Sequence, residues 1–198
     1  MKILITAFEP FGERDINASM VVMNALPEVI GQNQIIKELL PVDHKAAPAK
    51  METFLQKYQP DAVISLGEAS GTDTIRLEFV AINWMNFRIA DNSGGIVRDK
   101  KIAVDGATAY FSTLPLREIE ASLKNKNIPV SISMTAGTFL CNQIFYSVMH
   151  SLTEKTREVP AGFIHLPAEI VGYEGRIDNL DVERCVSGLK LILDLLLS

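Results

Sequence analysis

The chain has 198 residues and a formal net charge of −5; 47% of its residues are hydrophobic and 22% are charged. This length suits one hydrophobic core, and the composition is that of an ordinary globular protein, so we expect a single domain spanning 1–198. The negative charge gives no electrostatic reason to expect nucleic acid or an anionic membrane as a partner.

Strand-like and helix-like segments alternate through the first third of the chain. The apolar run KILITAF (2–8) predicts a buried first strand and is too short for a signal-peptide core. The segment NASMVVMNAL (17–26) predicts a helix that Asn17 or Ser19 can cap. Two further strands are predicted at 35–42 and 61–68, with a helix between them at 45–58.

The second part of the chain breaks this alternation once. The run EFVAINWM predicts a strand over 78–85, and the stretch 86–105 contains the turn signal DNSGG without a helical period. We therefore expect an irregular excursion or a hairpin over 86–105. The remaining predicted elements are a helix at 114–127, a strand at 129–136, a helix that opens at Cys141, a strand at 161–167 and a helix at 180–197.

Alternating strands and helices predict a three-layer α/β/α fold around a mixed, largely parallel sheet. Ligands in such folds gather at the carboxyl ends of the strands. The segments AFEPFG, GEASGT, TAGTFLC and HLP each end or follow a predicted strand, so we expect all four at one edge of the sheet.

The chain has two cysteines, Cys141 and Cys185, fewer than a secreted disulfide scaffold of this size usually carries. We expect free thiols in a reducing cytoplasm. The apolar tail LKLILDLLLS is interrupted by Lys190 and Asp194, so it cannot span a bilayer. It is expected to be a helix packed on the core, or partly on another subunit.

Cys141 admits two interpretations. With Ile144, Phe145 and Val148 it recurs at helical spacing, so the thiol can be one more apolar group on a buried face. It also lies where a helix begins, and there the unpaired amides and the helix dipole stabilise a thiolate and can hold an oxyanion.

A cysteine nucleophile needs a base and usually a group that orients the base. The chain has three histidines. His44 follows the end of a predicted strand and is compatible with a surface position, and His150 lies within a predicted helix. His165 lies at the end of an apolar strand. Glu78 begins an otherwise apolar run, and a buried carboxylate there needs a partner. Spacing alone leaves Cys141, His165 and Glu78 as either a catalytic triad or separately packed residues.

No HExxH or paired CxxC spacing is present, so we expect no metal and no cofactor.

Six motifs, in order, resemble pyroglutamyl peptidase I, a family of cysteine peptidases. They are TAFEPFG, VAINW, RIADNSG, DGATAYFSTLP, SMTAGTFLCNQIFY and GFIHLP, and they run from residue 6 to residue 167. The resemblance implies an α/β/α domain, usually a cytosolic homotetramer, that removes N-terminal pyroglutamyl residues from peptides. It implies Cys141 as nucleophile, His165 as base and then acid, Glu78 as third member, and Arg88 as a residue that helps to stabilise the oxyanion.

The same resemblance implies a pocket for a flat, neutral lactam ring, to which an apolar slot with few polar anchors is suited. Phe8 and Phe11 would form its aromatic walls, although core packing at a strand end is an alternative for both. Asn17 would supply a hydrogen bond, and the remaining apolar lining would be Ile89, Phe139 and Leu140.

The chain departs from the family pattern near this pocket. The family's GLAGGR or GQAGGR segment is GEASGT here, which introduces Glu68 and puts Thr72 in place of an arginine. The family's NPSW is NASM, with Ala18, and its ERVAIN is EFVAIN, with Phe79. A tyrosine that often follows HLP is Ala168 here. We expect these changes to affect substrate affinity, loop conformation and oligomer contacts rather than catalysis.

Two other functions are compatible with the sequence. The altered GEASGT loop is compatible with a non-catalytic binding protein that uses Glu68 to prefer another ligand, although the intact triad positions argue against it. A phosphorylase-like enzyme would share the architecture, but it needs a phosphate cradle, and no glycine-rich basic loop is evident.

Overall fold

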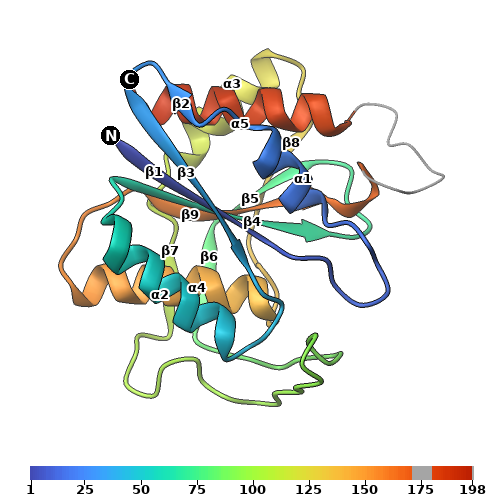
Figure 1. The fold of residues 1–198 in the computed structure, drawn as a ribbon, viewed down its shortest axis with the longest axis vertical. Coiled ribbons are helices and arrows are strands. Elements are labelled where there is room, and N and C mark those ends of the chain that lie inside the picture. Colours follow the sequence, from blue (N-terminus) through green and yellow to red (C-terminus); the bar gives the residue numbers. More distant parts are fainter. Residues whose placement is uncertain (171–179, 198) are drawn as a thin grey trace.

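The computed structural model describes residues 1–170 and 180–197 and contains a seven-stranded sheet (Figure 1). Its strands are β1 (Lys2–Phe8), β2 (Val29–Ile30), β3 (Asn33–Leu40), β4 (Ala62–Ala69), β5 (Ile75–Glu78), β8 (Val130–Ser133) and β9 (Ala161–Pro167). They lie in the order β2-β3-β1-β4-β9-β5-β8. Two further strands, β6 (Val80–Ile82) and β7 (Ala109–Phe111), pair separately.

The sheet is mixed and mostly parallel, as predicted. β1 pairs in parallel with β3 and β4, β4 with β9, and β5 with β8. Antiparallel pairing occurs between β2 and β3 and between β5 and β9. The reversal at β5 matters for the site, because it brings the end of β5 beside the middle of β9.

Helices cover both faces of the sheet (Figure 1). Two apolar cores follow, one on each face. One core receives side chains from α1 (Ala18–Ala25), α3 (Leu116–Asn125) and α5 (Val182–Leu197), and the other from α2 (Ala46–Tyr58) and α4 (Leu140–Glu154). The arrangement is the expected three-layer α/β/α fold. Because the sheet is covered on both faces, β9 is buried at all seven positions, which explains why AGFIHLP reads as a continuous run instead of an alternating one.

One predicted strand is wrong. The run 78–85 is not a single strand: Glu78 ends β5, and Val80 begins β6 in the other sheet. At the break, the Phe79 N–H donates to Ser133 O and Phe79 O accepts from the Ser112 N–H, so the chain changes partner strands at Phe79. The irregular excursion over 86–105 is confirmed. The pattern also missed β2, β7 and the short 3₁₀ helix η1 (Ala168–Ile170).

The C-terminal helix packs on the core, as one of the two interpretations of the tail predicted. Its buried residues include Cys185, Leu189, Ile192 and Leu193. Among the helices described here, none combines the length and the apolar character that a membrane crossing requires.

Candidate active site

Strand register brings Glu78 and His165 together. Glu78 lies opposite Phe163 in the antiparallel pair β5–β9, and His165 lies two residues further along β9, so its side chain leaves the sheet on the same face. His165 Nδ1 is 2.8 Å from Glu78 Oε1. The two residues are 7% and 1% exposed, so this contact is shielded from solvent.

The start of α4 delivers Cys141. The helix begins at Leu140, and the N-cap residue Phe139 provides no side-chain cap hydrogen bond. The first amides of a helix have no partner within it, so here they remain for another acceptor, and the helix dipole favours negative charge beside them. Gly137, with a φ of 77°, takes the left-handed conformation that turns the chain into this helix.

Gly67 leaves room for the thiol. A Cβ at Gly67 would lie 3.0 Å from Cys141 Sγ and 2.8 Å from Phe163 Cζ. Gly67 is also the residue that pairs with His165 in the β4–β9 register. The absent side chain therefore lets Cys141 lie directly over the sheet, next to the imidazole of His165.

The electrostatics favour a charged imidazole. Burial lowers the pKa of His165, but the charge and hydrogen bond of Cys141, together with those of Glu78, outweigh it and raise this pKa to about 9. Within the described residues, Glu78 Oε2 is buried without a hydrogen-bond partner. A thiol at a helix start, an imidazole and an orienting carboxylate are the groups that nucleophilic catalysis requires.

The predicted pocket residues separate into two groups. Phe11 packs against Phe139 with ring centroids 5.5 Å apart, and Phe139 packs against Phe87 at 4.6 Å. Phe8 and Leu140 are 4% and 1% exposed and belong to the core beneath the rings. Phe87 was missed, because a buried aromatic residue inside an irregular segment gives no periodic signal.

Asn17 caps α1, as the sequence predicted. Its Oδ1 accepts bonds from the Ser19 N–H at 2.9 Å and the Ser19 hydroxyl at 2.6 Å, and its Nδ2 donates to Glu9 O at 3.1 Å. Both ends of the amide thus have partners within the chain, and the loop before α1 is fixed by them.

Arg88 and Ile89 follow Phe87 on the irregular segment. Both are exposed, and Ile89 is 44% exposed. Over residues 1–170 and 180–197, the Arg88 side chain makes no hydrogen bond or ion pair. The structure therefore brings Cys141, His165 and Glu78 together and leaves Arg88 at the surface.

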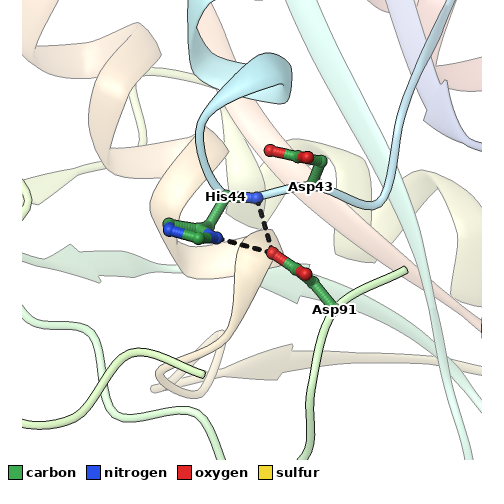
Figure 2. A group of neighbouring side chains, drawn as sticks. All are labelled: Asp43, His44 and Asp91. Atoms are coloured by element: carbon green, nitrogen blue, oxygen red, sulfur yellow. Dashed lines mark hydrogen bonds and ion pairs between the residues drawn. The ribbon is translucent and has the colours of Figure 1, made fainter. Parts of the chain in front are cut away.

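A second histidine–carboxylate pair is formed by His44 and Asp91 (Figure 2). His44 donates its backbone N–H to Asp91 Oδ2 at 3.0 Å, and its Nδ1 lies 2.6 Å from the same oxygen. The His44 carbonyl accepts a bond of 2.8 Å from Gln143 Nε2, in the first turn of α4. The prediction that His44 is a surface residue is wrong, because its side chain is only 18% exposed and is paired.

Asp43, His44 and Asp91 have donor atoms within 4.8 Å of one another, a spacing that could hold a metal ion. Both oxygens of Asp91 and Oδ1 of Asp43, however, already accept hydrogen bonds. Asp91 Oδ1 accepts bonds from Ser93 N–H, Ser93 Oγ and Gly95 N–H, and Asp43 Oδ1 accepts from the first amides of α2. These residues are better explained as a structural junction than as a metal centre. The junction connects α2, the segment after β6 and α4.

His150 has a structural partner. Its Nδ1 lies 2.9 Å from Tyr110 Oη, and its ring stacks on Tyr146 with centroids 5.8 Å apart. His150 is therefore a partly buried residue with a structural role. His165 is thus the histidine that the described structure brings to Cys141.

Comparisons with known proteins agree with this geometry. The pyroglutamyl peptidase family profile matches residues 1–196. A pyrrolidone-carboxylate peptidase of Fusobacterium nucleatum is 38% identical over 200 residues, covering 100% of this chain and 93% of that protein. The solved pyrrolidone carboxyl peptidase of Pyrococcus furiosus is 33% identical with a TM-score of 0.92, covering 100% of this chain and 98% of that one. Pyroglutamyl peptidase I of Bacillus amyloliquefaciens is 32% identical with a TM-score of 0.88, covering 96% and 94%.

The fold and its structural neighbours make this protein an α/β peptidase. More specifically, the chain belongs to the pyroglutamyl peptidase family, which the profile matches over nearly its whole length.

Proposed function

We propose that this protein removes N-terminal pyroglutamyl residues from peptides by means of a Cys141–His165–Glu78 triad and a thioester intermediate. The observation that carries the proposal is the set of contacts around His165: Glu78 Oε1 lies 2.8 Å from its Nδ1, and the Cys141 side chain lies beside the ring and raises the pKa of His165. Membership of the family supplies the substrate class.

The chemistry begins with attack on the carbonyl carbon of the pyroglutamyl residue. The Cys141 thiolate forms the C–S bond while the carbonyl π electrons move to oxygen, and the first amides of α4 stabilise that oxyanion. His165, which carries the thiol proton, donates it to the leaving amine as the C–N bond breaks. Water then loses a proton to His165 and attacks the thioester, which releases pyroglutamate and regenerates the thiol. Glu78 holds the imidazole in one orientation and stabilises its positive charge throughout.

The surroundings of Cys141 suit a neutral ring. Phe11 and Phe139, backed by the buried ring of Phe87, form an aromatic surface next to the start of α4. Such a surface favours a flat lactam over a charged amine, because an ammonium group would lose its hydration there without gaining a carboxylate partner. Arg88, on the neighbouring segment, is proposed to approach the oxyanion when substrate is bound.

Three chromogenic amides test the proposal: pyroglutamyl, prolyl and glutaminyl. A site that hydrogen-bonds the lactam N–H and carbonyl should favour the first by about 10⁴-fold or more in kcat/KM. Cys141→Ser should lose nearly all turnover and remain folded, whereas Cys185→Ser should stay active. Similar kcat/KM values for all three amides would contradict the substrate assignment.

A non-catalytic binding protein on the same fold is the alternative, and the introduction of Glu68 near the loop motivates it. That function predicts measurable affinity for a pyroglutamyl amide without product release. A phosphorylase-like enzyme instead predicts turnover that depends on added phosphate. Assays with and without phosphate, beside a binding measurement, separate these outcomes.

We also propose a homotetramer in the cytoplasm. Phe79 and Phe111 are 38% and 62% exposed, and their rings contact each other at 5.0 Å, a surface suited to a subunit contact. Both cysteines are free, which suits a reducing compartment. Analytical ultracentrifugation of wild type and Phe111→Ser tests the assembly. A monomer in both cases would contradict it.

A further inference from the structure

The loop between β1 and α1, residues 9–17, is held by the Asn17 amide, by bonds of Glu9 to Leu40 O and to the Val42 N–H, and by two further anchors. In its first half, Asn92 Nδ2 donates to Pro10 O at 2.9 Å, and Asn92 Oδ1 accepts from the Gly12 N–H at 3.3 Å. In its second half, the anchor is Glu68 at the end of β4. Phe11, which packs on Phe139, lies between Pro10 and Gly12, the two residues that Asn92 binds, and the Glu68 anchor holds the rest of the same short loop.

Glu68 uses both carboxylate oxygens. Oε1 accepts a bond of 2.9 Å from Arg14 Nη1, and Oε2 accepts a bond of 2.8 Å from the Ala18 N–H. Ala18 is the first residue of α1, a helix with no acidic side chain in its first turn. Glu68 therefore supplies, from another strand, the negative charge that a helix start favours.

Arg14 extends the same connection to β9. Its Nη2 donates to Ala168 O at 3.0 Å, just after the strand that carries His165. The guanidinium thus ties the loop to the ends of two neighbouring strands. Of the two groups that Arg14 contacts, Ala168 lies three residues after His165 in the sequence, and Glu68 directly follows Gly67.

The direction of the Glu68 side chain argues against direct contact with substrate. Gly67 faces Cys141, and successive residues of a strand point to opposite faces. Glu68 therefore leaves the sheet on the face covered by α1, away from the thiol. Its side chain is 13% exposed, and the described structure already gives partners to both of its oxygens.

The charge on Glu68 is costly for folding. Burial raises the pKa of Glu68, the Ala18 N–H and Arg14 offset only part of that effect, and the nearby carboxylate of Glu169 adds to it. A buried ion pair of this kind is weak evidence for stability. A role in holding the loop accounts for the pair better than a role in stabilising the fold.

We propose that Glu68 and Arg14 are positioning residues that hold the loop 9–17 so that Phe11 stays against Phe139, and that neither touches the substrate. The link to substrate rests on the proposed function. Glu68 and Ala18 are both positions at which this chain departs from the family pattern. They are also the acceptor and the donor of one hydrogen bond. Glu68 then marks a different way of fixing the loop and not a different ligand.

The test is a double-mutant cycle with Glu68→Gln, Arg14→Met and the double variant. Hydrogen exchange of the amides in 9–17 reports the loop without any substrate. KM and kcat for a pyroglutamyl amide report the pocket, and the iodoacetamide alkylation rate of Cys141 reports the nucleophile. The matched control is the pair Arg117–Glu120 on α3, with a contact of 3.1 Å and an Arg117 side chain that is 77% exposed, changed to Met and Gln.

Each single variant should speed exchange in the loop and raise KM by about tenfold, the size of one lost charge-assisted hydrogen bond. The double variant should be no worse than the more affected single variant, because both break one connection. The kcat and alkylation rate should change by less than about threefold. Glu68→Gln should be as stable as wild type or more stable, and the control pair should match wild type throughout.

Several results would overturn the proposal. Multiplicative effects of the two substitutions would show that they act separately. A higher KM in Glu68→Gln without faster loop exchange would make Glu68 a substrate ligand. An equal fall in kcat and alkylation rate would place its effect on Cys141. If the wild type turned over no pyroglutamyl amide, the proposed function would fail, and the exchange data alone would still decide the role of the pair.

Discussion

Two histidine–carboxylate pairs in this molecule have nearly the same contact and different surroundings. His165 Nδ1 lies 2.8 Å from Glu78 Oε1, and His44 Nδ1 lies 2.6 Å from Asp91 Oδ2. The oxygens of Asp91 accept bonds from three backbone amides and the Ser93 hydroxyl as well as from the ring of His44. Glu78 Oε2 has no partner among the described residues.

The difference separates a structural pair from one suited to chemistry. Asp91 is stabilised by fixed amides, so its charge does not depend on a proton at His44. Glu78 has one hydrogen bond in a buried site, so the positive charge of His165 is its main compensation. Cys141, followed by Glu78, raises the pKa of His165, and the bond to Glu78 keeps its imidazole oriented.

The largest expected effect concerns the two histidines themselves. His165→Ala should lower kcat/KM by about 10³-fold or more, because both the base and the acid are lost. His44→Ala should leave the kcat of correctly folded enzyme within about tenfold and should mainly lower stability. Steady-state kinetics on active-site-titrated samples check this, with His150→Ala as the control. An essential His44 or His150 would contradict the assignment.

The space beside the thiol gives the next effect. Gly67→Ala places a methyl group 3.0 Å from Cys141 Sγ and 2.8 Å from the Phe163 ring, so the ring must shift and the thiol must give way beside it. A displacement of this size should cost about 10²-fold in kcat/KM. Gly188→Ala, in α5, contacts only side-chain ends of the opposite core and should keep full activity. Equal activity of both variants would mean that thiol position is not critical.

The two carboxylates should respond in opposite ways. Glu78→Gln should lower turnover by about 10- to 10²-fold with little loss of stability, because the amide oxygen still accepts a bond while the charge is lost. Asp91→Asn should cost about 2–4 kcal/mol of unfolding free energy, because its amide group cannot accept all the bonds of the carboxylate. Urea unfolding and kinetics on both variants give the comparison. Similar stability losses would contradict it.

The smallest effects are those of pH on stability, and their signs differ. The amides and ring of His44 outweigh burial and hold the pKa of Asp91 well below the ordinary 3.8, so that contribution is present above 3.8 and is lost as the pH falls. The pKa of His165 is raised from 6.5 to about 9, so its contribution is complete below 6.5 and is lost as the pH rises through 9. We would measure the free energy of unfolding from pH 2 to pH 10. Its decrease at acid pH should be lost in Asp91→Asn, and its decrease at alkaline pH should be lost in Cys141→Ser.

The sequence predicted the layers of the fold because most elements carry strong apolar patterns. It failed at 78–85, where the apolar pattern continues through Phe79 although the chain leaves one sheet for another. Periodicity reports which residues are buried and does not report which strand they pair with. The position of Glu78 at the end of β5, and not at the start of a strand, is a consequence of that pairing.

The candidate site was predictable where motifs carry it, and not where distant residues meet. Cys141, His165 and Glu78 were candidates from their positions in predicted elements, the family resemblance favoured them as a triad, and the fold brings them together. His44 and Asp91 are 47 positions apart, and Arg14 and Glu68 are 54 apart, and no local pattern joins either pair. Asn17 was identifiable as a cap because that role depends only on its neighbours in sequence.

The most direct test of the triad is to trap the thioester. Wild-type protein mixed with a pyroglutamyl ester and quenched in acid within milliseconds should carry a pyroglutamyl adduct on the peptide that contains Cys141, detected by mass spectrometry. The adduct should accumulate further in Glu78→Gln, where the imidazole that activates water is less well oriented, and should be absent in Cys141→Ser. Turnover without any adduct on Cys141, together with an active Cys141→Ser variant, would contradict nucleophilic catalysis by this residue.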